Sequence, residues 1–292
     1  MSAGPLARQV FGREFQNPLL LAAGTAGFGR ELAGVMDLDR LGGLVTKAVS
    51  REPRAGNPPP RVAEFPGGML NSIGLANPGL ERVRAEYLPW LARHLSRARV
   101  LVNVVGRTVD DFVAVVAGLD GLEPITAFEL NLSCPNTKAG GVEFGSDPGT
   151  VADVVARCRA ATRLPIVVKL SPVLPDIAGM ACVARDAGAA GVTVVNTIPG
   201  LAYGEDGGTR LGNGSGGVSG PALLPVGVLA TRKIAERMGG TFPIIGVGGV
   251  RSADDVRQYL RAGATLVAVG TAALADPKLP ERIVRELERH DG

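Results

Sequence analysis

The chain alternates short apolar runs with longer segments in which apolar residues recur every three or four positions. The first pattern is typical of buried strands and the second of amphipathic helices, so their alternation predicts a parallel sheet wound with helices. Eight strands are expected, at Leu19–Ala23, Leu44–Val49, Val100–Val105, Phe128–Leu132, Ile166–Leu170, Val192–Asn196, Ile244–Val247 and Leu266–Val269. Eight such units in 292 residues close most naturally into a (β/α)8 TIM barrel of the α/β class, expected as a single domain over residues 1–292.

The segments between the expected strands carry helical stripes. Clear examples are Val151, Val154, Val155 and Cys158, and near the end of the chain Leu279, Ile283, Val284 and Leu287. The helix expected from Gly79 to Ala98 contains Pro89, which lacks a backbone N–H and should bend or break it. We interpret Trp90, Cys158 and Cys182 as packing residues.

Two connections, at about 50–77 and 198–219, are too long to be simple links, and long structured loops in compact domains are usually functional. Together with the loop at about 135–146, they make three inserted loops. In the third loop, Gly212, Gly214 and Gly217 satisfy a GxGxxG pattern, but no expected strand precedes them. A dinucleotide-binding motif must directly follow a strand, so this pattern does not indicate dinucleotide binding. A mobile loop or a subunit contact is the better interpretation.

Polar residues and glycines gather where the expected strands end. In chain order they are Ala23-Gly24-Thr25, Lys47, Asn103, Asn131, Lys169, Asn196-Thr197, Gly248-Gly249 and Gly270-Thr271. In a barrel, catalytic groups lie at the carboxyl ends of the strands. A buried strand has no structural use for a lysine or an asparagine at its end unless a ligand or partner pairs with it. The pattern predicts a ligand site at this end of the barrel.

The last two expected strands run into glycine motifs, IIGVGGV (244–250) and VAVGTA (267–272). Glycines at such junctions let backbone N–H groups approach a phosphate, and the loops after strands seven and eight are the usual phosphate site of these barrels. Together with Lys169, Asn103 and Asn131, this pattern favours flavin mononucleotide (FMN), because a cation near the flavin ring stabilises the charge that appears there on reduction. Tight turns that need glycine for backbone reasons are the alternative interpretation.

Composition narrows the function further. The 31 basic and 28 acidic residues leave a net charge of +3 without a basic stripe, which argues against nucleic acid. No apolar run reaches the roughly 18–20 residues of a membrane span, and the N-terminal residues lack the pattern of a signal peptide, so we expect a cytoplasmic protein. The three cysteines are far apart, which predicts no metal site and no iron–sulfur centre in this chain.

The most informative stretch is AFELNLSCPNTKAGGVEFG (127–145), an apolar run that ends in polar groups and continues into a glycine-rich loop. Cys134 is either a small buried hydrophobe or a base that takes a proton from a substrate. This stretch resembles the active-site segment of class 1 dihydroorotate dehydrogenases of the B type, in its motif NLSCPN, the Gly-Gly loop that follows and the motif FGSDP. MLNSIGLANPG (69–79) resembles the long-loop motif of the same type, and the resemblance runs from Asn17-Pro18 to Asp276-Pro277.

This resemblance implies an FMN-binding TIM barrel that oxidises dihydroorotate to orotate in pyrimidine biosynthesis. Cys134 would be the catalytic base, FMN would accept the hydride, and the loop Pro135 to Gly145 would exclude water. The family's FMN contacts fall on Ala23, Lys47, Ala48, Asn103, Asn131, Lys169, Val195, Gly220, Gly248, Gly249, Gly270 and Thr271. Its substrate contacts fall on Lys47, Asn71, Ser72, Ile73, Gly74, Leu75, Asn131, Asn196 and Thr197. Many members have serine where Ala23 stands, so a contact from Ala23 must use its backbone.

The B type also implies a dimer of catalytic chains in a heterotetramer with a separate FAD and [2Fe–2S] subunit, which passes electrons to NAD⁺. Two alternatives remain within related enzymes: an A-type dihydroorotate dehydrogenase that uses fumarate, and a dihydropyrimidine dehydrogenase-like FMN barrel. Lys47 argues against the latter, because a neutral pyrimidine has no carboxylate to pair with it. A non-catalytic phosphate-binding barrel would give Cys134 no role. The scarcity of histidine, only His94 and His290, weakens flavin-dependent 2-hydroxy-acid oxidases.

Overall fold

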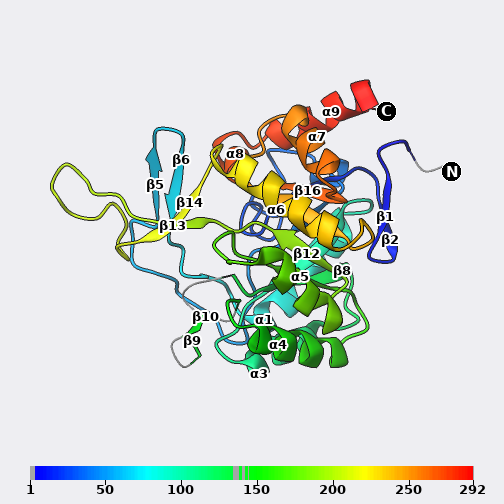
Figure 1. Ribbon diagram of the computed structural model, residues 1–292, viewed down its shortest axis with the longest axis horizontal. Coiled ribbons are helices and arrows are strands. Elements are labelled where there is room, and N and C mark those ends of the chain that lie inside the picture. The colour runs from blue at the N-terminus through cyan, green and yellow to red at the C-terminus, as the bar shows by residue number, and fades with distance from the viewer. Residues whose placement is uncertain (1–3, 134–137, 140–141, 144, 292) are drawn as a thin grey trace.

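The computed structural model describes residues 4–133, 138–139, 142–143 and 145–291. Eight parallel strands form a closed barrel in which β16 pairs with β3 and every other neighbour follows chain order (Figure 1). The strands are β3 (Leu19–Leu21), β4 (Gly43–Val45), β7 (Arg99–Val104), β8 (Ile125–Asn131), β11 (Ile166–Lys169), β12 (Gly191–Val194), β15 (Ile244–Val247) and β16 (Leu266–Val269). The (β/α)8 barrel and all eight strands expected from the sequence are confirmed.

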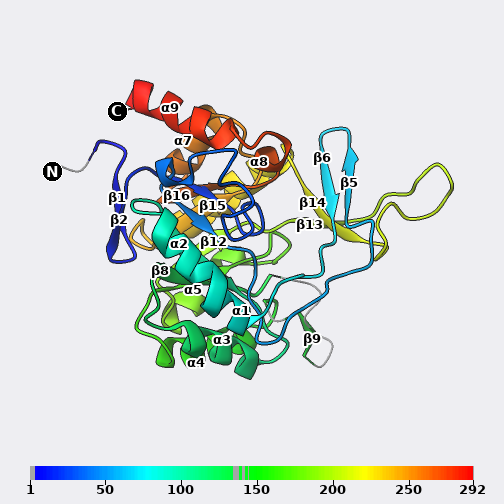
Figure 2. The same cartoon turned by 180° about the vertical axis from the view of Figure 1, so that it is seen from behind.

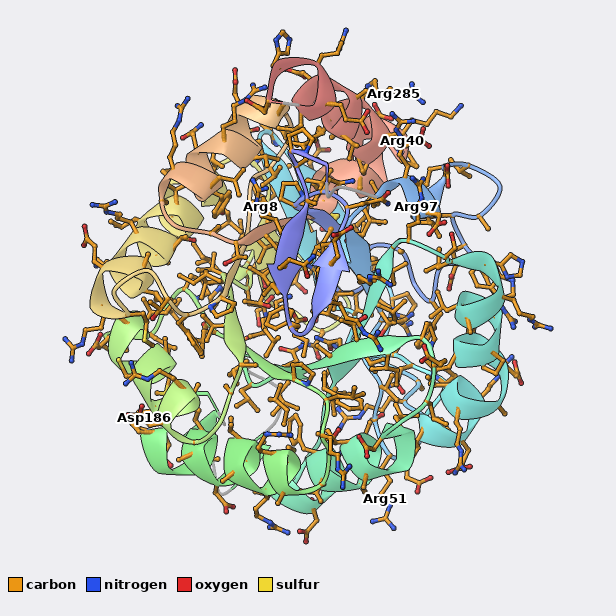
Figure 3. All side chains as sticks on the ribbon, turned by 90° about the vertical axis from the view of Figure 1, so that its right-hand side faces the viewer. Arg8, Arg40, Arg51, Arg97, Asp186 and Arg285 are labelled. Carbon is orange, nitrogen blue, oxygen red and sulfur yellow. The ribbon has the colours of Figure 1, made fainter. Side chains whose placement is uncertain are left out.

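The helices form a ring outside the barrel, seen end-on in Figure 3, where the charged side chains of Asp186 and Arg285 lie on the outer circumference. They are α1 (Leu80–Arg82), the π-helical turn η2 (Val83–Tyr87), α2 (Leu88–His94), α3 (Val109–Leu119), α4 (Pro148–Ala160), α5 (Ile177–Asp186), α6 (Leu223–Arg237), α7 (Ala253–Arg261), α8 (Thr271–Ala275) and α9 (Leu279–Asp291). In the described part of the chain, no helix combines the length and the hydrophobicity that a membrane span needs.

The expected helical stripes face the barrel. Helix α4 buries Val151, Val154, Val155 and Cys158, and α9 buries Ile283 and its neighbours in the stripe. Burial raises the pKa of the Cys158 thiol to about 12, so this side chain packs as a small hydrophobe, as expected. Burying one such aliphatic side chain contributes about 1.5–3 kcal/mol, which is how the outer ring is held to the sheet.

Pro89 changes the helix as expected, but by a local rearrangement rather than a sharp break. The helical segment runs from Leu80 to His94, and just before Pro89 it widens into η2, where the Leu88 N–H donates to the carbonyl oxygen of Val83, five residues back. A proline removes one hydrogen bond and crowds the preceding turn, and a π-turn relieves both.

The first crossover contains no α-helix in the described structure. Between β3 and β4 the chain makes a series of turns and the short 3-10 helix η1 (Leu38–Arg40). Gly24, Gly27 and Gly29 all adopt positive φ angles, which a right-handed helix cannot contain. This unit therefore departs from the expected strand–helix alternation.

The barrel interior is sealed at its amino-terminal end. Side chains alternate along a strand, and the inward residues at this end are apolar: Leu20, Val45, Leu101, Ala127, Val167, Ile245 and Leu266 form one buried cluster with Val10, Phe11 and Phe15. The last three come from the hairpin of β1 (Arg8–Val10) and β2 (Arg13–Phe15), which crosses this opening (Figure 3). Only the carboxyl ends of the strands can therefore admit a ligand to the interior.

Two of the long connections are not loops throughout, which corrects the expectation for 50–77 and 198–219. They contribute β5 (Val62–Phe65), β6 (Gly68–Asn71), β13 (Ile198–Gly200) and β14 (Gly216–Ser219) to one antiparallel sheet, in the order β13-β14-β6-β5. The sheet projects from the side of the barrel opposite the hairpin (Figures 1 and 2). Pairing between segments about 150 residues apart in sequence creates it, so the local pattern of either segment is insufficient to predict it. The expected loop 135–146 lies partly outside the described residues, which include an antiparallel pair of β9 (Lys138–Ala139) and β10 (Val142–Glu143).

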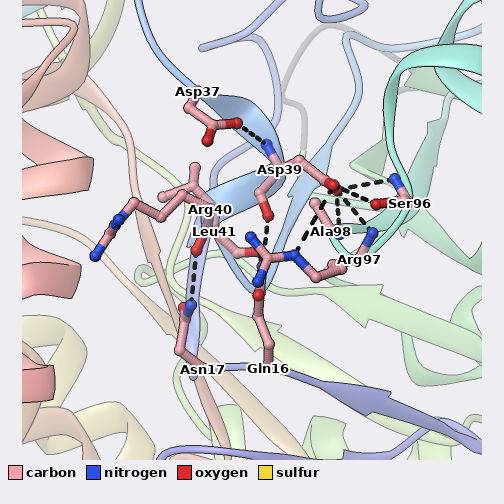
Figure 4. Close-up of polar contacts among 9 residues, drawn as sticks. All are labelled: Gln16, Asn17, Asp37, Asp39, Arg40, Leu41, Ser96, Arg97 and Ala98. Carbon is pink, nitrogen blue, oxygen red and sulfur yellow. Dashed lines mark hydrogen bonds and ion pairs between the residues drawn. The ribbon is translucent and has the colours of Figure 1, made fainter.

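Asp39 ties the first crossover to the start of β7. Its carboxylate accepts hydrogen bonds from the backbone N–H groups of Ser96, Arg97 and Ala98 at 2.9, 2.7 and 2.8 Å, and from the Ser96 hydroxyl (Figure 4). Gln16 secures the same crossover by donating to the carbonyl oxygens of Asp39 and Leu41. Partial burial pushes the pKa of Asp39 upward, but the hydrogen bonds outweigh burial and hold the pKa below its ordinary value.

Replacing Asp39 with alanine is expected to lower the free energy of unfolding by about 1–3 kcal/mol at neutral pH, because the N–H groups of 96–98 lose their acceptor. A carboxylate whose folded pKa is depressed stabilises the protein above its unfolded pKa of about 3.9, and that stability is lost as pH falls through the folded pKa. Urea unfolding of both proteins at pH 7 and near pH 3 should show the difference shrinking in acid. Asp153→Ala, an exposed change on α4, is the control; an equal loss in both variants would contradict the assignment.

Candidate active site

A layer of polar side chains lies inside the barrel just above the apolar cluster. Its members are Lys47, Asn103, Glu129, Asn131, Lys169 and Thr193. Lys47, Asn103, Glu129 and Lys169 each follow an inward residue of the apolar cluster by two positions, and Asn131 follows Glu129 by two. All except the half-buried Lys47 are buried, with Asn103 at 0% and Glu129 at 1% exposure. The strand register sets Asn103 opposite Glu129 and Lys169 opposite Asn131. The predicted Lys47, Asn103, Asn131 and Lys169 are thus gathered at one end of the barrel.

The sequence analysis missed two residues of this layer, Thr193 and Glu129, and Glu129 is the charged one. One of its carboxylate oxygens accepts from Asn103 Nδ2 at 2.7 Å and the other from Thr193 Oγ1 at 2.6 Å. Asn103 Oδ1 is buried and has no hydrogen-bond partner among the described residues. The sequence did contain a signal for it, because Glu129 is the one charged residue in the strand sequence AFELNL.

A chain of hydrogen bonds links the end of β8 to the end of β12. Asn196 Nδ2 donates to Ser133 Oγ at 2.8 Å, and the Ser133 hydroxyl donates to Asn131 Oδ1 at 3.0 Å. Asn196 Oδ1 accepts from the backbone N–H of Thr197 at 2.9 Å. These contacts fix which end of each amide faces which neighbour, so Asn131 and Asn196 are oriented before any ligand arrives.

The projecting sheet brings Asn71 to the same region. Asn71 is the last residue of β6, it pairs with Gly217 of β14, and its Nδ2 donates to the Gly217 carbonyl oxygen at 3.3 Å. A Cβ built on Gly217 would lie only 2.0 Å from Thr197 Oγ1, so glycine is needed where these segments meet. Gly217 therefore lies between Asn71 and Thr197, so the predicted substrate residues Asn71, Asn196 and Thr197 are close together.

The segment NSIGL (71–75) is held by two asparagines that the sequence analysis did not single out. Asn57 donates through Nδ2 to the buried Ser72 hydroxyl at 2.7 Å, and its backbone N–H donates to the Ile73 carbonyl oxygen. Asn77 Nδ2 donates at 2.8 Å to both Ser50 Oγ and the Leu75 carbonyl oxygen, which ties the two ends of the connection together. Gly74 and Leu75 have φ angles of 69° and 57°, so this turn is left-handed at both residues.

The glycines after β15 orient a backbone N–H group, that of Gly249, for contact with a ligand. Gly248 and Gly249 have φ angles of 123° and 74°, and the Tyr259 hydroxyl donates to the Gly248 carbonyl oxygen at 2.8 Å. Burial raises the pKa of Tyr259 above its ordinary value, so this hydroxyl stays a donor. The trans peptide then directs the Gly249 N–H away from Tyr259 and α7. A backbone donor in this orientation can meet a phosphate.

The other glycine motif lies beside the projecting sheet. The Thr271 hydroxyl, at the start of α8, donates to Ser219 Oγ at 2.7 Å. Gly220 follows with φ 129°, and a Cβ there would lie 2.7 Å from the Gly68 Cα, so no larger residue fits. A Cβ on Gly270 would come no nearer than 3.7 Å to another residue, which leaves its surroundings open.

The remaining predicted residues follow the strands as expected, with Ala23 half-buried after β3, Ala48 buried beside Lys47, and Val195 buried after β12. Cys134 lies outside the described residues, one position beyond Ser133. Within the described part of the chain, no group of three or more His, Cys, Asp or Glu side chains could hold a metal ion. His94 and His290 lie exposed on α2 and α9, away from this layer.

A closed parallel barrel with lysines and amides gathered at its carboxyl ends defines the class of (β/α)8-barrel enzymes. The family model described as dihydroorotate dehydrogenase matches residues 5–290, and the chain belongs to this family. It is 43% identical to the "Dihydroorotate dehydrogenase B (NAD(+)), catalytic subunit" of Geobacillus kaustophilus (strain HTA426), over 97% of this chain and 89% of that protein. Proteins of the same name from Desulforudis audaxviator (strain MP104C) and Pelobacter propionicus (strain DSM 2379 / NBRC 103807 / OttBd1) are 44% and 43% identical, over 96% and 95% of this chain and 91% and 90% of theirs.

Proposed function

We propose that this chain is the catalytic subunit of a B-type dihydroorotate dehydrogenase, which oxidises (S)-dihydroorotate to orotate with FMN in pyrimidine biosynthesis. The observation that carries the proposal is the polar layer at the open end of the barrel, formed by the buried Asn103, Asn131 and Lys169 and the half-buried Lys47. Such a layer is costly to bury without ligand atoms to pair with it. Family membership supports the same reaction.

The residues present fit FMN. Asn103 Oδ1 is a buried acceptor that lacks a donor among the described residues, and a flavin ring offers an N–H. Lys169 would supply the positive charge near the ring, while the Gly248–Gly249 turn and the Gly270–Thr271 segment would hold the phosphate. When bound, FMN supplies the two-electron oxidation by accepting hydride from the substrate.

The remaining groups suit an anionic pyrimidine. Orotate is a planar ring edged with amide donors and acceptors, and Asn71, Asn131 and Asn196 can offer both halves of an amide pair. Lys47 would pair with the substrate carboxylate. A dihydropyrimidine dehydrogenase-like barrel would act on neutral rings, which leave this half-buried cation without a partner.

Cys134 would remove the proton from C5 of dihydroorotate. Its place follows from sequence, one residue after Ser133, whose hydroxyl already links Asn131 to Asn196. A thiol with an ordinary pKa of about 8.5 is a few per cent thiolate at neutral pH, so the rate of proton removal should rise with pH through this ionisation.

The electrons would leave through a partner. Relatives named as the catalytic subunit of an NAD⁺-linked enzyme support an assembly with a second subunit. The resemblance to the B type assigns FAD and a [2Fe–2S] cluster to that subunit. A homodimer of catalytic chains within a heterotetramer is the proposed arrangement. A fumarate-dependent A-type enzyme, which acts without such a subunit, is the alternative.

The purified chain is expected to contain FMN, and the flavin absorbance is expected to fall on anaerobic addition of dihydroorotate. Denaturation should release about one FMN per chain, and the flavin absorbance should fall with dihydroorotate but not with dihydrouracil, which lacks the carboxylate that Lys47 would bind. Release of FAD, or bleaching by dihydrouracil alone, would move the chain to another flavin barrel. A chain that binds no flavin after reconstitution with FMN would refute the proposal.

A further inference from the structure

The proposed reaction uses every polar residue of the interior layer except Glu129 and its neighbour Thr193. Glu129 is 1% exposed, lies on β8 between β7 and β11, and is the one acidic side chain in the layer. Both of its carboxylate oxygens accept hydrogen bonds, from Asn103 and from Thr193. A carboxyl group is costly to bury in this way, so its presence calls for a specific role.

The first consequence concerns the orientation of the Asn103 amide. An ionised carboxylate only accepts hydrogen bonds, so the Asn103 amide must turn its Nδ2 toward Glu129. The opposite end of the amide, Oδ1, is thereby committed as an acceptor, and this atom is buried without a partner among the described residues. The orientation of Asn103 is thus set by its hydrogen bond to Glu129.

The second consequence is electrostatic. The layer contains two cations, Lys47 and Lys169, and one anion. No ion pair within 4.0 Å joins Glu129 to either lysine in the described structure. Its charge therefore acts through space on whatever occupies the barrel mouth, in the opposite sense to the lysines and with little screening by water.

We propose that Glu129 is a positioning residue for the cofactor: it orients Asn103 so that Oδ1 accepts a hydrogen bond from an N–H of the flavin ring, and its negative charge makes the flavin harder to reduce. The proposal rests on FMN being the ligand of the barrel. Glu129 itself touches neither the substrate nor the reacting atoms in this account. It acts through Asn103 and through its charge.

Glu129→Gln tests both parts, because glutamine keeps the size of the side chain, removes the charge and can donate to Asn103 as well as accept from it. FMN affinity, measured by fluorescence titration of the apoprotein, should fall by about five- to tenfold, the usual worth of one buried hydrogen bond. The two-electron midpoint potential should rise by about 30 mV, which is a tenfold change in the reduction equilibrium. Glu123→Gln, an exposed change just before the other end of β8, is the matched control and should alter neither quantity.

Glu129→Asp separates the two parts, since it keeps the charge but is too short to hold both Asn103 and Thr193. It should lose FMN affinity like the glutamine variant. Because the charge is kept, the equilibrium constant for reduction of the flavin should stay within about threefold of the wild-type value. If the glutamine variant does not fold, as judged by circular dichroism, wild-type FMN affinity in the aspartate variant would overturn the positioning role. Unchanged affinity and potential in a folded Glu129→Gln protein would overturn the whole inference. Failure of the wild-type chain to bind FMN would instead refute the proposed function.

Discussion

Replacing Cys134 with alanine is expected to slow reduction of the flavin by dihydroorotate by about 10²–10⁴-fold, the usual contribution of a positioned general base. Affinity for FMN and orotate should stay close to that of the wild type, because Lys47, Asn131, Lys169 and Asn196 would make those contacts. Anaerobic stopped-flow absorbance measures the rate, and equilibrium titration measures the affinities. Cys134→Ser should recover activity only at higher pH, since a hydroxyl is a much weaker acid than a thiol.

The other two cysteines provide the control. Cys158 is fully buried on α4 and Cys182 is half-buried on α5, both outside the polar layer. Cys182→Ala should therefore reduce its flavin at the wild-type rate. A wild-type rate in Cys134→Ala, or an equal loss in Cys182→Ala, would refute the role of Cys134 as base.

The second large effect concerns the electron acceptor. The chain alone is expected to oxidise dihydroorotate with artificial dyes or oxygen but to leave NAD⁺ unreduced, and to gain NAD⁺ reduction when co-expressed with an FAD and [2Fe–2S] subunit. The sequence contains no dinucleotide fingerprint in a suitable context and no cysteine cluster for an iron–sulfur relay. NADH formation at 340 nm, with and without the partner subunit, measures the gain.

Fumarate distinguishes the two types of enzyme. Efficient turnover of dihydroorotate with fumarate by the chain alone would place it with the A type, which uses the same pocket for both substrates. Reduction of NAD⁺ by the chain alone would show that a nicotinamide site exists that the sequence motifs do not indicate. A subunit lacking its [2Fe–2S] cysteines is the matched control, since it should bind without restoring NAD⁺ reduction.

Much of the barrel could be read from local patterns. A strand such as β11 is a short apolar run that ends in Lys169, and a helix such as α4 shows its buried stripe at the correct spacing. Parallel strands bring their carboxyl ends to one rim, so the position of the polar residues at strand ends was predictable once eight units had been recognised. A disturbance of the helix at Pro89 was equally predictable, because the missing N–H is a property of the residue itself.

Other features depend on residues that meet only in the folded chain. Nothing near Asn71 indicates that it will pair with Gly217, yet this pairing builds the sheet that carries Asn71 to Thr197. Glu129 was read as part of an apolar strand, and its partners Asn103 and Thr193 lie on two other strands. The clamps made by Asn57 and Asn77 likewise join distant parts of one connection.

The sequence by itself determined the fold class, the eight strands and the residue types at the open end of the barrel, because hydrophobic periodicity and strand polarity are local properties of the chain. Only the tertiary structure decided which way the amides of Asn103, Asn131 and Asn196 face and that a buried carboxylate lies among them. Those features depend on hydrogen bonds of 2.7 and 2.8 Å between side chains from different strand units, Asn103 with Glu129 and Asn196 with Ser133. Such contacts exist only after the barrel has closed, and the orientation of each donor and acceptor is set by its neighbours rather than by its own sequence position.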